Sequence, residues 1–157
     1  IGFIIRSMKP QETFDFQIRK SWIALSKMYN EQVAQYGLTV AMGFALLNID
    51  IKNGTPSTSL GPKMGMESTS LSRLLNSLEK QALIARESNP NDGRSVLIKL
   101  TKEGLKMRNY SRQAVLDFNH QVLAEVSEED VRGFFKVMAT VSEVVDTHRA
   151  EETLRMT

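Results

Sequence analysis

Residues 60–104 read LGPKMGMESTSLSRLLNSLEKQALIARESNPNDGRSVLIKLTKEG, and two periodicities follow one another in this stretch. Leu71, Leu74, Leu75 and Leu78 recur at the spacing of one helix face, which predicts a helix over about 67–81. The segments LIARES and SVLIKL, at 83–88 and 95–100, are short and suited to strands, and the turn-prone run NPNDGR separates them. The stretch therefore predicts a helix followed by a β-hairpin.

Helical patterns flank this stretch on both sides. Pro10 opens the first helix, Gly37 suits the position after its end, and Thr39 suits the cap of the next one. Ser127 and Asp130 form a capping-box start for the last helix. The helices expected besides 67–81 are 10–36, 40–51, 57–64, 101–126 and 127–148. Pro62 lies inside the short helix, so we expect that element to start late or to be irregular. The chain is predicted to be mainly α with one small β-hairpin.

The helix over 67–81 carries a polar face opposite its leucines. That face holds Thr69, Arg73, Asn76 and Lys80, with Ser72 beside them. Arginine and asparagine pair with purine edges in the DNA major groove, and a helix fits that groove by size. Every amphipathic surface helix has a polar face, and the helix alone favours that simpler interpretation. The order of short helix, glycine turn, helix and hairpin is that of a winged helix-turn-helix, which favours DNA recognition.

Over about Leu38–Gly104 the sequence resembles the MarR family of bacterial transcriptional regulators. The resemblance depends on LEKxxLIxR, which begins at Leu78, and on DxRxxxxxLTxxG, which begins at Asp92. It implies a winged helix-turn-helix over 37–103 and a helical dimerisation region made of 1–36 and 104–157. It also implies a homodimer that binds a pseudo-palindromic operator in double-stranded DNA, with release by a small-molecule effector.

Carried over residue by residue, the resemblance implies a set of DNA contacts. The recognition-helix positions are Ser68, Thr69, Ser70, Ser72 and Arg73, and we add Asn76 from the polar face. Arg94 of the hairpin resembles a minor-groove probe that Asp92 steadies. Lys63, Lys80 and Lys99 are expected to contact phosphates. Two differences from the family pattern are expected to weaken DNA binding. Gly93 replaces a frequent second arginine, and Glu67 places a carboxylate near the phosphates.

Two further groups of residues have two interpretations each. Phe134, Phe135, Met138, Val141 and Val145 form an apolar stripe, which is either core within one subunit or, as we prefer, a subunit interface. The family resemblance implies an effector pocket for an aromatic or phenolic molecule, for which Trp22, Tyr29, Phe44 and Tyr110 are candidates. The simpler interpretation of these four is core packing.

Composition limits the remaining classes of function. With no cysteine among 157 residues, thiol chemistry and disulfides are excluded, and a cytoplasmic location fits. Residues 55–106 hold eight basic and five acidic residues, a net charge of +3, against −1 elsewhere. No apolar run approaches the roughly 18 residues of a membrane span, and IGFII lacks the flanks of a signal peptide.

His120 and His148 fit no catalytic or metal motif, so we expect no enzyme, cofactor or metal. The alternative function is a winged-helix protein–protein interaction module with weak or no DNA binding.

Overall fold

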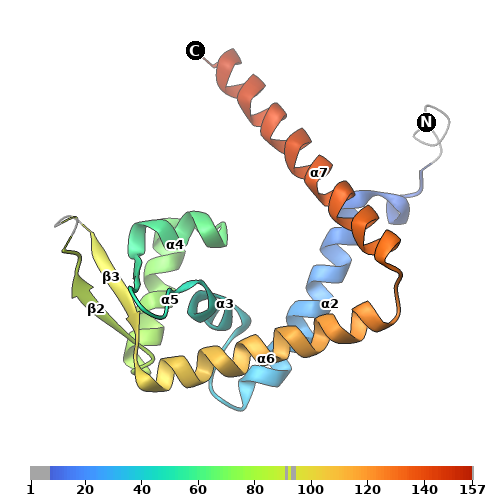
Figure 1. Cartoon of the computed structure of the whole chain (residues 1–157). Coiled ribbons are helices and arrows are strands. Elements are labelled where there is room, and N and C mark those ends of the chain that lie inside the picture. Colours follow the sequence, from blue (N-terminus) through green and yellow to red (C-terminus); the bar gives the residue numbers. More distant parts are fainter. Residues whose placement is uncertain (1–7, 91, 93–94, 157) are drawn as a thin grey trace. The chain divides into compact units, whose positions relative to one another are not determined.

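The computed structural model describes residues 8–90, 92 and 95–156, and helices dominate it (Figure 1). The elements in chain order are η1 (Pro10–Glu12), α2 (Phe14–Ala34), α3 (Val40–Asn48), β1 (Thr55–Pro56), α4 (Ser57–Met64), α5 (Ser68–Lys80), β2 (Ile84–Ser88), β3 (Val96–Leu100), α6 (Lys102–Ala124) and α7 (Glu128–Arg155). The chain forms two compact units, 1–114 and 115–157.

Local chemistry sets several of the helix ends, as the sequence predicts. The Thr39 hydroxyl accepts a hydrogen bond from the Met42 N–H at 3.3 Å and so caps α3. Gly65 ends α4 in the left-handed region, with φ of 61°. At the start of α7, the Ser127 hydroxyl accepts from the Asp130 N–H while the Asp130 carboxylate accepts from the Ser127 N–H. The expected caps at Thr39 and Ser127 are confirmed.

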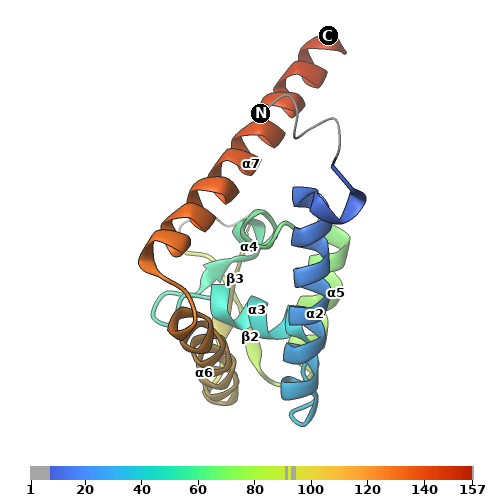
Figure 2. The same cartoon turned by 90° about the vertical axis from the view of Figure 1, so that its right-hand side faces the viewer.

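One apolar core joins the helices of the first unit to its sheet. Its largest fully buried side chains come from α3 and the residue after it, from α4, from α5 and from β3, and they are Leu46, Ile49, Leu60, Leu78 and Ile98. Figure 2 shows α3, α4 and α5 gathered beside β3. Burial of each such side chain stabilises the fold by about 1.5–3 kcal/mol relative to exposure. This core fixes the orientation of α5.

The sheet has three antiparallel strands in the order β1-β3-β2. Strands β2 and β3 pair from Ile84 with Leu100 to Ser88 with Val96, which confirms the predicted hairpin. The two-residue strand β1 adds to the other edge of β3 and was not expected from the sequence. The predicted fold class, mainly α with a small β-hairpin wing in a winged helix-turn-helix, is confirmed, and the sheet is one strand larger.

The junction between β3 and α6 explains two residues of the LTxxG pattern. The Thr101 hydroxyl donates to the Ala82 carbonyl at 2.7 Å and accepts from the Gly104 N–H at 3.0 Å. A Cβ atom on Gly104 would lie 1.8 Å from the Leu83 carbonyl oxygen, so only glycine fits at this close approach. Threonine and glycine together fasten the start of α6 to the chain segment that leads into β2.

Four predictions about helices need correction. The last helix, expected over 127–148, continues to Arg155. The helix expected over 10–36 is a short η1 followed by α2, because Thr13 between them is extended. The helix expected to reach Ile51 ends at Asn48, where the buried Ile49 turns to an extended backbone. The expectation that Pro62 delays or distorts its helix is wrong. Proline removes one N–H, and only two residues of α4 follow it, so little of the helix depends on that bond.

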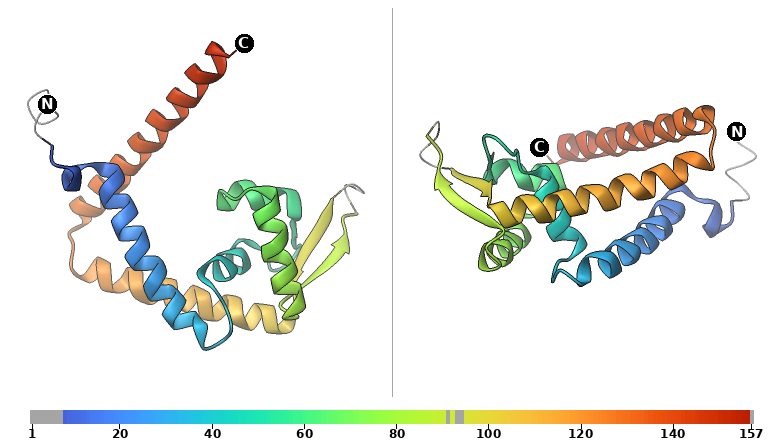
Figure 3. Two further views of the ribbon diagram at one scale, coloured as in Figure 1. Left: turned by 180° about the vertical axis from the view of Figure 1, so that it is seen from behind. Right: turned by 60° about the horizontal axis from the view of Figure 1, so that its bottom comes forward.

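The second unit, 115–157, contains the last part of α6 and all of α7, joined by the short turn visible in Figure 3. No described residue of α7 is buried in the single chain. Phe134 and Phe135 contact each other edge to face, with ring centroids 5.4 Å apart, yet they are 59% and 66% exposed. An apolar cavity of about 320 Å³ lies between these rings and Val122, Leu123 and Val126.

Candidate nucleic-acid interface

Helix α5 presents a polar surface because its apolar surface is fixed in the core. Leu71, Leu75 and Leu78 are buried, and Leu74 packs against them. The helical period then turns the remaining positions outward. The exposed residues are Glu79 and seven predicted DNA contacts, namely Ser68, Thr69, Ser70, Ser72, Arg73, Asn76 and Lys80. Lys63, at the end of α4, is exposed as well.

The N-terminus of α5 is open to solvent. Glu67 occupies the cap position with an extended backbone, but its carboxylate makes no capping hydrogen bond. The backbone N–H groups of the first turn therefore lack a side-chain cap, and such a helix end attracts anions. Ser72 donates its hydroxyl to the Ser68 carbonyl at 2.8 Å, and its oxygen can still accept a further hydrogen bond.

The hairpin lies beside α5 (Figure 3). The side chain of Arg86 connects the two. Arg86 of β2 donates from Nη2 to the Asn76 Oδ1 at 2.6 Å. Its Nε lies 3.5 Å from the Glu79 carboxylate. Asn76 is thus held toward the hairpin by its acceptor oxygen, which it would need for a bidentate contact with adenine. Sequence reasoning gave Arg86 only as part of the LIxR pattern, and its cross-brace to α5 depends on the fold.

A second ion pair joins the two strands of the hairpin. Lys99 of β3 lies 2.7 Å from the Glu87 carboxylate of β2, and both side chains are partly exposed. Lys99 is one of the predicted phosphate contacts, so its ammonium already has an anionic neighbour. Exposed pairs of this kind contribute about 0–1 kcal/mol. The pair therefore leaves Lys99 able to exchange Glu87 for another anion.

The turn between β2 and β3 is closed by hydrogen bonds around Asp92. The Asp92 N–H donates to the Asn89 carbonyl at 3.3 Å, and the Ser95 N–H donates to the Asp92 carbonyl at 3.0 Å. Ser95 is buried, and its hydroxyl accepts from the Asn89 amide at 2.6 Å. Asp92 is exposed at this turn. The predicted partner of its carboxylate, Arg94, and the neighbouring Gly93 lie outside the described residues.

The four predicted effector residues fall into three places. Trp22 of α2 stacks on Phe44 of α3, with ring centroids 5.8 Å apart and an interplanar angle of 19°. Tyr110 of α6 packs edge to face on Tyr36, with centroids 4.2 Å apart, and its hydroxyl accepts from the Gln35 amide at 3.1 Å. Tyr29 is buried, and burial raises its pKa. Trp22 remains 48% exposed.

Other kinds of site find little support in the described part of the chain. His120 and His148 are exposed, and no group of three or more potential ligands from His, Cys, Asp or Glu is placed to hold a metal ion there. In the same residues, none of the helices combines the length and the apolar character needed to cross a membrane.

Comparison with known proteins agrees with this geometry. The MarR family model matches residues 38–96, which run from the residue before the α3 cap into β3. The uncharacterized HTH-type transcriptional regulator YdgJ of Bacillus subtilis is 30% identical over 82 residues, which are 52% of this chain and 50% of that protein. The organic hydroperoxide resistance transcriptional regulator of Bacillus subtilis is 25% identical over 140 residues, 88% of this chain and 92% of that protein.

A solved structure, that of the S. aureus MepR–DNA complex, superposes with a TM-score of 0.74 at 19% identity. The match covers 86% of this chain and 98% of that one. It extends the likeness in fold beyond the residues that the family model matches. The sequence match over 38–96, the long match to a named regulator and the shared fold agree: over residues 38–96 this chain is similar to the MarR family, and its similarity in fold to a solved structure extends beyond them.

Proposed function

We propose that the protein is a sequence-specific DNA-binding transcriptional regulator that acts as a homodimer on a pseudo-palindromic operator. The observation that carries this proposal is the exposed face of α5. A leucine face fixed in the core turns hydroxyls, an amide and two cations toward solvent beside a hairpin. The relatives' names and the DNA complex of MepR support the same proposal.

In this proposal the first half of α5 reads the bases. Arg73 is exposed in the middle of the helix and is suited to a bidentate contact with guanine. Ser68, Thr69, Ser70 and Ser72 contact base edges or phosphates from the first turns. Asn76 contributes base contacts only when its oxygen leaves Arg86, so its contribution is linked to the position of the hairpin.

Lysines and the hairpin hold the protein on the duplex. Lys63, Lys80 and Lys99 bind phosphates, and Lys99 exchanges Glu87 for a phosphate as it does so. Arg94 enters the minor groove next to the α5 site, and Asp92 limits the conformations that its guanidinium adopts. Replacing Arg94 by alanine should then cost about 1–3 kcal/mol of DNA affinity.

The two subunits pair through 1–36 and 104–157, and the winged helix-turn-helix over 37–103 binds DNA. Support comes from α7, where Phe134, Phe135 and Val145 are exposed and Met138 and Val141 are only partly covered. Contiguous exposed apolar surface on this scale marks an interaction site. A second copy of the chain covers it in this proposal, so the preferred interpretation of the stripe is a subunit interface.

A small aromatic or phenolic effector releases the dimer from DNA. Trp22, Tyr29, Phe44 and Tyr110 supply its aromatic contacts, and the stacked pair of Trp22 and Phe44 is half exposed. A regulator of this kind acts on the chromosome, which places it in the cytoplasm and requires no catalytic residue.

Selection of bound fragments from the source genome tests the proposal. Two subunits related by a two-fold axis should enrich a pseudo-palindrome whose half-sites lie about 10–10.5 base pairs apart, or a multiple of that. An Arg73→Ala variant should enrich the site poorly, and Arg132→Ala on α7 is a matched control that should enrich it normally. Equal recovery of all fragments by the wild-type protein would contradict the proposal.

A protein–protein interaction module is the second candidate. It is favoured by carboxylates that neutralise cations of the interface, since Glu79 and Glu87 pair with Arg86 and Lys99 and Glu67 begins α5. Absence of duplex binding at low salt would select it over the regulator.

A further inference from the structure

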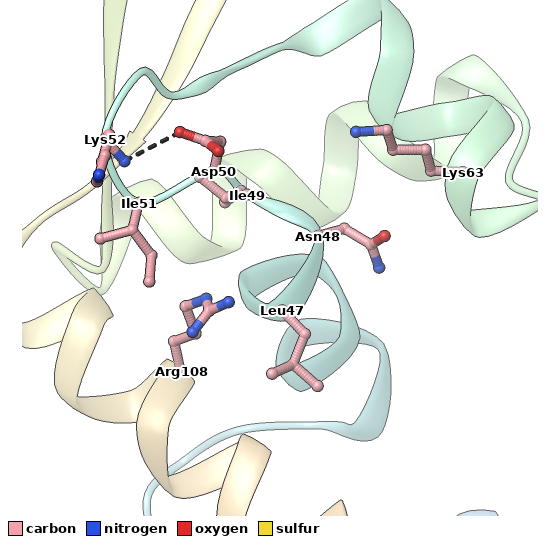
Figure 4. Close-up of a pocket in the computed structure, with 8 residues that line it drawn as sticks. All are labelled: Leu47, Asn48, Ile49, Asp50, Ile51, Lys52, Lys63 and Arg108. Atoms are coloured by element: carbon pink, nitrogen blue, oxygen red, sulfur yellow. Dashed lines mark hydrogen bonds between the residues drawn. The ribbon is translucent and has the colours of Figure 1, made fainter.

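A cavity of about 510 Å³ lies in the first unit, away from the exposed face of α5. It is formed by the end of α3, the turn that follows it, α4 and α6 (Figure 4). Among the described residues that line it, three side chains are cationic, namely Lys52, Lys63 and Arg108, and one, Asp50, is a carboxylate. The lining therefore carries a net charge of +2.

Arg108 is the central residue of this cavity. Figure 4 shows its guanidinium extending from α6 into the cavity, between Leu47 and Ile51. Its Nε is buried and has no hydrogen-bond partner among the described residues. A buried donor without a partner is rare in proteins and calls for an explanation, of which an ion or a water molecule is one. The planar guanidinium is suited to bidentate binding of an oxyanion.

Asp50 offsets only part of this positive charge. Its carboxylate accepts hydrogen bonds from the backbone N–H groups of Asn53 at 2.7 Å and Lys52 at 3.0 Å. These bonds, with the nearby charges of Lys52 and Lys63, hold the Asp50 pKa below its usual value. In the described residues no ion pair within 4.0 Å joins Asp50 to either lysine or to Arg108. The Asp50 carboxylate therefore stabilises the turn through these backbone hydrogen bonds. The three cationic side chains can still bind an anionic ligand.

The rest of the lining defines the body of the ligand. Leu47 and Ile51 supply aliphatic surface on either side of Arg108. The volume lies within the usual range of about 300–1,000 Å³ for small-molecule sites. Tyr110, a predicted effector residue, follows Arg108 by two positions, so about 200° of helical rotation separates the two side chains. The cavity is thus distinct from the aromatic residues assigned to an effector.

We propose that this cavity binds a small aliphatic organic anion. Its carboxylate or phosphate group contacts Arg108 and the two lysines, and its apolar body contacts Leu47 and Ile51. The ligand would contact α6 and the end of α4 together. Lys63 is shared with the proposed phosphate contacts, and the titration below uses the free protein, so its result does not depend on DNA binding.

A titration of the full-length ¹⁵N-labelled protein followed by NMR tests the proposal. The probes are isovalerate, its uncharged analogue isovaleramide, isobutyl phosphate and inorganic phosphate. Isovalerate or isobutyl phosphate should bind saturably and shift the amide signals of residues 47–52. Whichever of the two binds more tightly identifies the anionic group. Equal binding of isovaleramide would contradict the anionic site, and equal binding of inorganic phosphate would contradict the aliphatic contact. No binding by either organic anion up to about 10 mM would overturn the proposal.

Variants locate the binding. Arg108→Gln removes the charge and keeps most of the length, and it should weaken binding by about tenfold or more. Lys52→Gln, on an exposed turn, should weaken binding without affecting folding. Arg112→Gln is the matched control, since Arg112 is exposed one helical turn further along α6 and does not line the cavity. An equal loss in Arg112→Gln, or no loss in both cavity variants, would overturn the assignment.

Discussion

Replacement of Gly104 by alanine tests how α6 is fastened to the end of the helix-turn-helix. The new Cβ would lie 1.8 Å from the Leu83 carbonyl oxygen and 2.8 Å from its carbon. That oxygen cannot easily retreat, because it accepts a hydrogen bond from the Thr101 N–H at 3.1 Å. Overpacking of a fixed backbone costs about 3 kcal/mol, at the upper end of the usual range. The higher helix propensity of alanine, compared with glycine, offsets at most about 1 kcal/mol of this loss in stability.

The expected net loss for Gly104→Ala is therefore about 2 kcal/mol, or a fall in Tm of about 4–8 °C for a chain of this length. Urea denaturation followed by circular dichroism at a fixed protein concentration measures it. Gly133→Ala is the matched control, because nothing lies within 4 Å of a Cβ at that helical position. It should leave stability unchanged or raise it. A loss below about 0.5 kcal/mol in Gly104→Ala would refute the close-approach argument.

Four further predictions concern the interface, the last helix and the dimer. Arg73→Ala should lower affinity for the selected operator by about 1–3 kcal/mol in fluorescence anisotropy, and an unchanged Kd would remove Arg73 from the base contacts. A double-mutant cycle of Asn76→Ala and Arg86→Gln should give a coupling of about 0.5–1 kcal/mol in urea denaturation, since the contact is partly exposed, and additive losses would mean no coupling. The Ser127 hydrogen bonds hold the Asp130 pKa below its usual value, so the stability that they add is present above about pH 4 and is lost as pH falls through the lowered pKa. Asp130→Asn should lower Tm at neutral pH and match the wild type near pH 2.5. A difference in Tm that stays constant with pH would contradict this linkage. Phe135→Asp should convert a micromolar dimer into a monomer in light scattering, and an unchanged mass would exclude that ring from the subunit interface.

The elements that could be predicted are those whose signals are local. Thr39 and Ser127 cap helices through bonds that span three residues, and the leucines of α5 repeat within one helix. These patterns determine the order of helices and the hairpin without reference to distant parts of the chain. The positions of helix ends that depend on tertiary packing were less accurate, as at Ile49, which leaves the helix to enter the core.

The features that could not be predicted depend on partners far apart in the sequence. Strand β1 forms because Thr55 pairs with Ile98. The sequence KNGTPSTS at 52–59 contains no pattern that predicts this pairing. Arg86 meets Asn76 only after the hairpin folds back along α5, so the polar face of α5 contains one residue with a second role. The cavity around Arg108 combines three segments of the chain and has no sequence motif. The resemblance to a family supplied the DNA contacts, and their roles in this chain are proposals.

Salt dependence of binding to the selected operator tests the central claim most directly. If Lys63, Lys80 and Lys99 contact phosphates in both subunits, six counterions are displaced, and log Kobs should fall against log salt with a slope of about −5. The measurement is fluorescence anisotropy of a labelled duplex between about 50 and 200 mM salt. A steep slope near this value, with binding retained at the upper end, is the predicted result. A slope near zero, or no binding to any duplex at low salt, would contradict a DNA-binding regulator.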